Sequence, residues 1–331
     1  MRILAVLCLL ACAAGSIVAQ EEGELTATRR ILPSIGPGLR TVKRGPDGRL
    51  YVLASPSPGL VVFDAAGKQI LSIGELAAAP LPAKGSRALI TFAEDCDADA
   101  EGKIYVADRG ANLVQVFSPD GALLRSIPVK NPISVAALPE GEVAVGTLRE
   151  QHLVMVFDKN GRDVREFGDP EQLTEREDLN RYLNIGELAT DAQGHLYYAF
   201  VYMPEPTVRQ YDRVGYAGQD VQYTALEAWP AAQAARKEIE RQERRGEPPT
   251  LKPILTAMGV DRTNGEIWMA LHNTLLHFDK EGNRRASYQL YTPEGARLEV
   301  NTILVEKDHL IMGNDPLGIY EFDRPAKKSP Q

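Results

Sequence analysis

The chain has 331 residues, of which 44% are hydrophobic and 25% charged, and its formal net charge is −8. These proportions are typical of a soluble globular protein with a sizeable core. The acidic balance argues against a protein that binds the phosphate backbone, and the aromatic residues are too scattered for base-stacking platforms. We therefore expect no nucleic-acid partner.

The first residues differ from the rest of the chain. Met1-Arg2 is a short basic segment, and the apolar run at 3–14 is shorter than the ~20 residues that span a bilayer. Residues 1–19 are therefore predicted to be a secretory signal. The alternative is a lipoprotein signal that ends before Cys12, because Leu9-Leu10-Ala11-Cys12 resembles a lipobox. We expect a secreted or periplasmic protein, or a lipid-anchored one at the cell envelope, without a membrane span.

Glycine-bearing turns recur in pairs along the chain. The two glycines of a pair are 19, 19, 20, 21 and 17 residues apart, in the pairs Gly48/Gly67, Gly102/Gly121, Gly141/Gly161, Gly194/Gly215 and Gly265/Gly282. Short apolar strands flank these turns, and glycine supplies the positive φ that tight hairpins need. A constant unit with connections of variable length predicts independent four-stranded antiparallel sheets that pack radially.

Six such units predict an all-β fold, a six-bladed β-propeller over residues 20–325. The sixth unit stops before its fourth strand. Residues 24–35 precede the first unit, and we expect them to form the missing outer strand and close the ring. Residues 326–331 are expected to be a disordered tail. The blades are predicted at about 39–74, 90–127, 132–167, 184–226, 253–290 and 298–323 plus 24–35.

The second unit contains Ile104-Tyr105-Val106-Ala107-Asp108, followed by Asn112 and by Val114-Gln115-Val116-Phe117. This segment resembles the NHL repeat, whose marks are Tyr-Val-Ala-Asp, an Asn a few residues on and a Val-Phe strand. The resemblance is specific in this unit and diffuse over about residues 24–323. It implies a β-propeller, and since the family includes binding scaffolds and enzymes it leaves the function open.

The two faces of the predicted propeller differ in loop length. The glycine turns are short and share one face, whereas the opposite face carries the long connections, including insertions at 169–183 and 227–252. Both insertions are predicted to contain a helix. The clearer one is Pro230 to Arg245, with Gly246 at its end. Because binding residues concentrate in long loops on rigid scaffolds, we expect the ligand on the loop-rich face.

Polar and aromatic residues near this face are the candidate ligand-binding residues, and the arginines among them could attract an anion. They are Arg40, Arg109, Asn112, Arg149, Asn184, Tyr202, His272, Asn301 and Asn314. We expect a non-catalytic binding propeller that recognises a protein, peptide or glycan.

The alternative is a metal-dependent hydrolase or lyase, similar to propeller lactonases and amidating lyases, with a divalent ion over the central tunnel. Alignment of the units groups Asp95 with Thr41, Ser134, Gly186, Ala257 and Asn301, which is not an acidic cage. The corresponding hypothesis is a Ca²⁺ site made by Asp95, Asn184, Glu187 and Asn301; otherwise we expect no metal and no cofactor. The histidines do not converge, so a His/Glu acid–base pair of the streptogramin-lyase kind is the less favoured form of catalysis.

Overall fold

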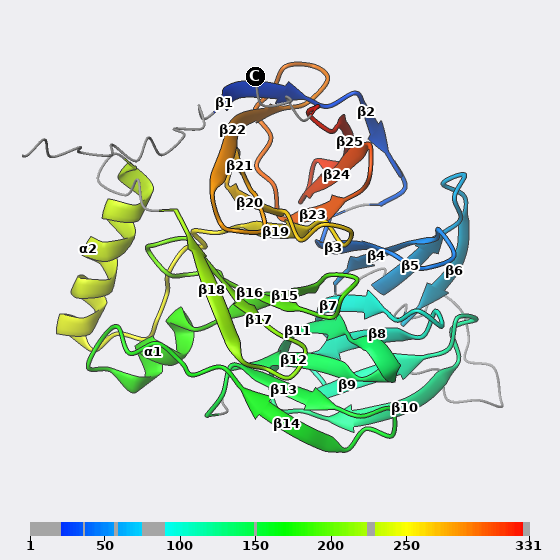
Figure 1. Cartoon of the computed structure of the whole chain (residues 1–331), viewed down its shortest axis with the longest axis horizontal. Helices are drawn as coiled ribbons and strands as arrows, with labels where there is room; N and C mark the ends of the chain where they lie inside the picture. The colour runs from blue at the N-terminus through cyan, green and yellow to red at the C-terminus, as the bar shows by residue number, and fades with distance from the viewer. Residues whose placement is uncertain are drawn as a thin grey trace, which may run out of the picture.

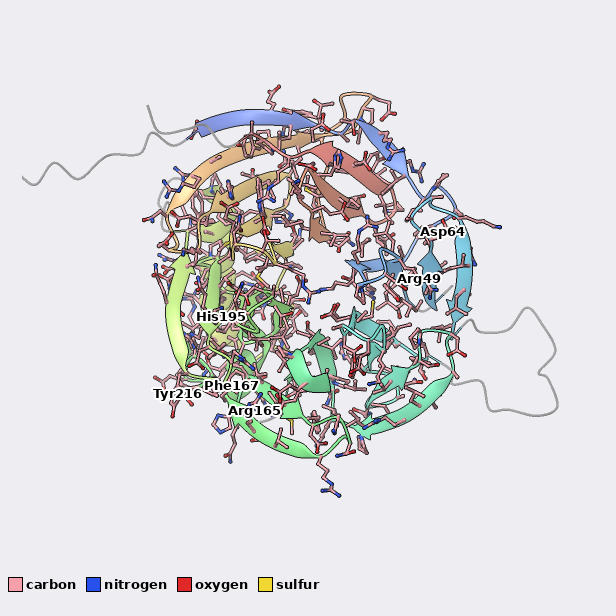
Figure 2. The ribbon with its side chains drawn as sticks, turned by 45° about the vertical axis from the view of Figure 1, so that its right-hand side comes forward. Arg49, Asp64, Arg165, Phe167, His195 and Tyr216 are labelled. Carbon is pink, nitrogen blue, oxygen red and sulfur yellow. The ribbon has the colours of Figure 1, made fainter. Side chains whose placement is uncertain are left out.

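The computed structural model describes residues 21–35, 37–55, 59–74, 90–148, 151–223 and 229–326. They form six antiparallel sheets arranged as blades around a central axis, which is the predicted six-bladed β-propeller (Figure 1). The turned view in Figure 2 shows the ring more openly. The predicted signal with Cys12 and residues 327–331 of the predicted tail lie outside the described residues.

Each blade runs from an inner strand beside the axis to an outer strand at the rim. Blades I to III comprise β3 (Leu39–Arg44), β4 (Leu50–Ala54), β5 (Gly59–Phe63) and β6 (Gln69–Ile73); β7 (Ala93–Ala98), β8 (Ile104–Asp108), β9 (Leu113–Phe117) and β10 (Leu123–Pro128); and β11 (Pro132–Ala137), β12 (Val143–Thr147), β13 (Val154–Phe157) and β14 (Asp163–Phe167).

Blades IV to VI follow the same order. They comprise β15 (Gly186–Thr190), β16 (Leu196–Phe200), β17 (Thr207–Tyr211) and β18 (Ala217–Gln222); β19 (Ala257–Val260), β20 (Ile267–Leu271), β21 (Thr274–Phe278) and β22 (Arg284–Tyr291); and β23 (Thr302–Val305), β24 (His309–Asn314) and β25 (Gly318–Asp323).

The N-terminal segment belongs to two blades. β2 (Arg29–Ile31) pairs antiparallel with β25 and supplies the outer strand of blade VI, whereas β1 (Glu21–Thr26) pairs in parallel with β22 as a fifth strand of blade V. Between them, the amides of Ala27 and Thr28 donate to carbonyls of Tyr291 and Glu321, so the chain steps across from one blade to the next. This corrects the expectation of a single outer strand at 24–35.

Aspartates begin most of the predicted glycine turns. In five of them one carboxylate oxygen accepts the backbone N–H groups two and four residues further on, at 2.8–3.0 Å: Asp64, Asp99, Asp158, Asp191 and Asp212. The glycine three residues after each aspartate has a φ between +78° and +97°. The Asp-x-x-Gly pattern thus fixes the hairpins that give the blades their common shape.

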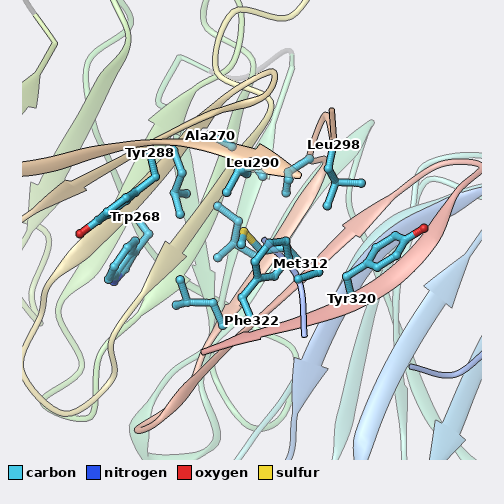
Figure 3. Close-up of a cluster of buried hydrophobic side chains, with 14 of the residues drawn as sticks. Trp268, Ala270, Tyr288, Leu290, Leu298, Met312, Tyr320 and Phe322 are labelled. Carbon is cyan, nitrogen blue, oxygen red and sulfur yellow. The ribbon is translucent and has the colours of Figure 1, made fainter. Parts of the chain in front are cut away.

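The core lies between neighbouring blades. In one buried cluster, Trp268 and Tyr288 of blade V face Met312 and Phe322 of blade VI (Figure 3). Because both faces of a blade are covered in this way, strands such as β4 are buried at every position. Each large side chain removed from water contributes about 1.5–3 kcal/mol.

Two helices join to form an annex, which we define as α1 (Glu177–Leu183), α2 (Pro230–Arg245) and the chain around them (Figure 1). α2 has the predicted bounds. Leu179, Leu183, Ile239 and Leu251 form a buried cluster of their own in the annex. The Arg176 guanidinium, just before α1, donates to two carbonyls at the end of α2, each at 2.7 Å. Neither helix of the described segments is long and apolar enough to cross a membrane.

Asp108, from the NHL-like segment, has a structural role. It is fully buried and accepts hydrogen bonds from the backbone N–H groups of Thr91 (2.8 Å), Phe92 (3.0 Å) and Ala111 (3.2 Å), and from the Gln115 side chain (2.8 Å). Its carboxylate therefore fixes the loop that leads into β7. Asp108, within the segment that most resembles a known repeat, therefore stabilises the fold.

Replacing Asp108 with asparagine should lower the free energy of unfolding by about 2–3 kcal/mol, because the amide turns a donor toward backbone donors that are buried. Urea unfolding of Asp108→Asn against the unmodified chain measures the change. The matched control is Asp163→Asn, at an exposed position, which should stay within about 0.5 kcal/mol. Equal effects of the two changes would contradict this role of Asp108.

Candidate functional site

The inner strands surround a central tunnel with a cavity at each mouth. The loop-face cavity, on the side of the long connections, has a volume of about 320 Å³, and the turn-face cavity, on the side of the glycine turns, about 640 Å³. Lys43, Met258 and Ile303 line both cavities and therefore mark the waist of the tunnel.

One residue of each inner strand lies at the same height in the tunnel wall. The strand register places these residues opposite equivalent positions of the second strands, and the layer consists of Thr41, Asp95, Ser134, Glu187, Ala257 and Thr302. The sequence alignment put Gly186 and Asn301 in this layer, one residue too early. Counted back from the turn glycine, Glu187 lies seven residues before Gly194, as Asp95 lies seven residues before Gly102, so this spacing identifies the layer in blade IV.

Polar side chains of this layer join neighbouring blades. One oxygen of Asp95 accepts from the Ser134 hydroxyl (2.6 Å) and from the backbone N–H of Val135 (3.1 Å). The Ser134 hydroxyl oxygen in turn accepts from the Leu188 N–H at 2.9 Å. Across the closure of the ring, the Thr302 hydroxyl oxygen accepts from the Val42 N–H at 3.1 Å. The positions of these tunnel groups are thus fixed by the assembly of the ring.

Charged groups gather at the floor of the loop-face cavity, which we define as Lys43, Asp95 and Glu187. Burial, together with the charge of Asp95, raises the pKa of Glu187 to about 8, although Lys43 and the Met258 N–H act against the shift. Burial also raises the pKa of Asp95. For Lys43, burial lowers the pKa, but the surrounding carboxylates outweigh it and the net shift is upward. The lysine is therefore a cation at neutral pH.

The mouth of the same cavity carries two guanidinium groups on one carboxylate. Glu94 lies 2.7 Å from Nη1 of Arg109 and 3.7 Å from Nη1 of Arg40, and its side chain is 15% exposed. The two arginine side chains are 37% and 43% exposed. The Arg40 guanidinium also lies 5.2 Å above the centre of the Phe92 ring. The mouth therefore has an excess of one positive charge, with N–H donors open to the cavity.

The annex places an aromatic pair beside this mouth. Tyr202 lines the cavity, and its ring centre is 4.5 Å from that of Tyr182. Tyr182 belongs to α1, so the helix brings the second ring to this position. Burial raises the pKa of Tyr202 well above its usual range, so its hydroxyl is neutral. The insertion at 169–183 thus contributes to the site by holding Tyr202 in place.

Four of the candidate ligand residues line the loop-face cavity: Arg40, Arg109, Tyr202 and Asn301. The structure also brings in Lys43 and Glu94, which the sequence analysis did not select. Lys43 lies two residues after Thr41 on the tunnel side of β3, and this period of two is the signal that could have identified it. Arg149 lies outside the described residues.

Four other candidates do not line this cavity: Asn112, Asn184, His272 and Asn314. The asparagines are engaged by the backbone. The Asn184 amide, for example, is bound to Glu171 and Asn180 backbone groups at 2.8 Å, and the Asn112 side-chain oxygen accepts the Asn131 N–H at 2.9 Å. His272 lies 3.8 Å from Glu299. Loop asparagines that read as ligand groups in sequence are here part of the loop structure.

The hypothetical calcium ligands are only partly together. Asp95, Glu187 and Asn301 line the cavity, whereas the Asn184 amide is bound within its own loop. Lys43 also places a cation among the carboxylates. Among the residues that the structure describes, no group of three or more His, Cys, Asp and Glu is placed to hold a metal ion. This donor set does not fit a resident divalent ion.

No family model and no curated protein matches the sequence. Solved structures match the fold. A streptogramin B lyase shares 13% identity at a TM-score of 0.54, over 90% of this chain and 87% of that one. The virginiamycin B lyase of Staphylococcus aureus shares 11% at 0.52, over 90% and 88%. Hydrazine synthase of Kuenenia stuttgartiensis shares 11% at 0.55, over 87% and 96%. At these identities the similarity shows the six-bladed propeller fold alone.

The raised pKa of Glu187 predicts a pH dependence of stability. Between the ordinary value of 4.5 and about 8, the folded chain holds a proton at Glu187 that the unfolded chain has lost. The free energy of unfolding should therefore fall as the pH rises through this window. Glu187→Gln should flatten the fall and leave the contribution of Asp95, whose pKa burial also raises.

Urea unfolding at several values between pH 5 and pH 8.5 measures this slope. Glu166→Gln, at an exposed position of β14, is the control and should keep the slope of the unmodified chain. A Glu187→Gln slope equal to that of the control would show that Glu187 ionises normally.

Proposed function

We propose that the chain is an exported, non-catalytic binding propeller that takes the carboxylate-bearing part of a peptide or protein partner into its loop-face cavity. The observation that carries the proposal is the sharing of Glu94 by Arg40 and Arg109 at the cavity mouth. Guanidinium groups recognise carboxylates through directed N–H donors. Because Glu94 holds the guanidinium groups of Arg40 and Arg109 in place, they are already oriented for the carboxylate of a ligand.

The size and lining of the cavity favour a chain segment over a flat protein surface. A volume of about 320 Å³ is at the small end of ligand pockets, so it admits one or two side chains or a chain end. Ile133, Ile185 and Leu255 provide apolar walls beside the arginines. This mixture suits a peptide better than a hydroxyl-rich glycan. Tyr202 and Tyr182 add rigid aromatic area at the edge, as in many interfaces.

Two further parts of the proposal rest on the sequence. Export, to the periplasm or outside the cell, rests on residues 1–19, with the lipid anchor at Cys12 as the alternative. A relation to NHL-repeat propellers, many of which are scaffolds for binding, rests on residues 104–117.

A lyase or hydrolase is the second candidate, and one observation favours it. Glu187 is a buried carboxyl group at the tunnel whose pKa is raised to about 8, and such groups are common among general acids and bases. Two of the structurally similar proteins are lyases by name. An enzyme would convert its substrate into a product, whereas a binding protein would release the ligand unchanged.

A thermal-shift screen tests the proposal with glutamate-rich hexapeptides, uronic-acid oligosaccharides and divalent metal ions. Acidic peptides should raise the melting temperature of the unmodified chain, because ligands that bind the folded state stabilise it. Arg109→Ala and Arg40→Ala should each weaken peptide binding at least about tenfold, the loss expected when a charge-assisted hydrogen bond of ~1.4 kcal/mol or more is removed. Arg162→Ala, at an exposed turn, is the control.

If only uronic-acid oligosaccharides raise the melting temperature, the ligand is a glycan and not a peptide. A shift that needs a divalent ion and is abolished by a chelator would favour the enzyme. The absence of any shift, or equal peptide binding by Arg109→Ala, would refute the proposed site.

A further inference from the structure

The two ends of the loop-face cavity present different charged groups. At the mouth, two guanidinium groups share the single carboxylate of Glu94. At the floor, the ammonium of Lys43 faces three carboxyl groups, those of Asp95, Asp97 and Glu187. Lys43, Asp95 and Glu187 line the same cavity as Arg40 and Arg109. The cavity therefore has a positively charged mouth and a floor where the carboxyl groups of Asp95 and Glu187 lie around the Lys43 ammonium.

The carboxyl groups around Lys43 differ in the number of hydrogen bonds that the protein donates to them. Asp95 accepts from the Ser134 hydroxyl and from the N–H groups of Val135 and Cys96 at 2.6–3.1 Å, and Asp97 accepts from the Ala137 N–H at 2.9 Å. Glu187 has the Met258 N–H as its hydrogen-bond donor. A carboxyl group offers about four acceptor sites, so Glu187 retains capacity for a ligand.

A second acceptor lies on the same cavity wall. The Asn301 amide donates through Nδ2 to the Leu39 carbonyl at 2.9 Å, while its Oδ1 is buried and has no hydrogen-bond donor within the described part of the chain. Buried acceptors without a partner are unusual in folded proteins and call for a ligand or a water. Asn301 and Glu187 both belong to the lining of the cavity, so each brings an acceptor to its wall.

We propose that the loop-face cavity binds a ligand that carries an amine as well as a carboxylate, with the ammonium at Glu187 and Asn301 Oδ1 and the carboxylate at Arg40 and Arg109. The ligand class is an amino acid or a short peptide with both groups free. The inference rests on the proposed function, since it assigns the carboxylate to the same arginine pair, and it adds the amine subsite. Lys43 remains with Asp95 and Asp97.

The amine subsite has a consequence for protons. The groups that face Glu187 are Asp95 and Lys43, together with the Met258 N–H. Near pH 7 burial and the charge of Asp95 leave the carboxyl group largely protonated, and an incoming ammonium favours its ionised form. Binding therefore transfers the Glu187 proton to the solvent. Titration calorimetry at pH 7 in phosphate and in Tris, which differ in ionisation enthalpy, should reveal release of up to one proton for each ligand.

The probes are ω-amino acids from glycine to 6-aminohexanoate, each compared with the carboxylate and the alkylamine of equal length. For the length that fits, the amino acid should bind at least about tenfold more tightly than its carboxylate. Glu187→Gln should lower the affinity for the amino acid to that for the carboxylate of equal length, and it should abolish proton release. Asn301→Ala should reduce amino-acid affinity without affecting proton release.

The controls separate the subsite from the rest of the site. Glu166→Gln should behave as the unmodified chain, and each variant is first shown to be folded by its melting curve. If carboxylates bind as tightly as amino acids and depend on Arg109 but not on Glu187, the amine subsite is refuted while the proposed function stands. If none of the probes binds and acidic peptides also fail, both are refuted.

Discussion

The blades of this propeller are separate sheets, so no backbone ladder runs from one blade to the next. Side chains of the tunnel wall make that connection instead. The carboxylate of Asp95 reaches the backbone of blade III, the hydroxyl of Ser134 reaches blade IV, and the hydroxyl of Thr302 reaches blade I across the closure of the ring. The tunnel wall depends on this layer, while apolar packing and polar contacts nearer the turns, such as the ion pairs of Arg324 with Asp261 and Glu266, join the blades elsewhere.

The same constraint shapes the candidate site. The polar groups of this layer lie on the inner strands, and the inner strands line the tunnel, so these groups join blades and are also groups that a ligand would meet. Asp95 has a structural role in joining the blades, since both of its carboxylate oxygens accept hydrogen bonds from the protein. Glu187 occupies the equivalent position of blade IV, yet its pKa is raised to about 8, which marks a group that is buried without full compensation.

The sequence predicted the parts of the fold that local chemistry determines. Asp-x-x-Gly turns require particular backbone angles, so their spacing revealed six blades, and α2 was bounded correctly by Pro230 and Gly246. The parallel strand β1 was missed because parallel pairing leaves no turn in the sequence. The register of Glu187 was placed one residue too early, although its spacing of seven residues from Gly194 equals that of Asp95 from Gly102. Of the candidate ligand residues, Arg40 and Arg109 line the cavity, whereas Asn184 and Asn112 are bound to loop backbone groups, and such side-chain bonds cannot be predicted from the sequence.

The central claim is that the arginine pair at the loop-face cavity forms the binding site. A crystal structure of the full chain grown with a glutamate-rich hexapeptide tests it most directly. The account predicts that a carboxylate of the peptide occupies the loop-face cavity, within hydrogen-bond distance of Arg40 and Arg109 and beside Tyr202. A peptide bound in the turn-face cavity or on an outer strand, with the arginine pair touching Glu94 alone, would contradict it.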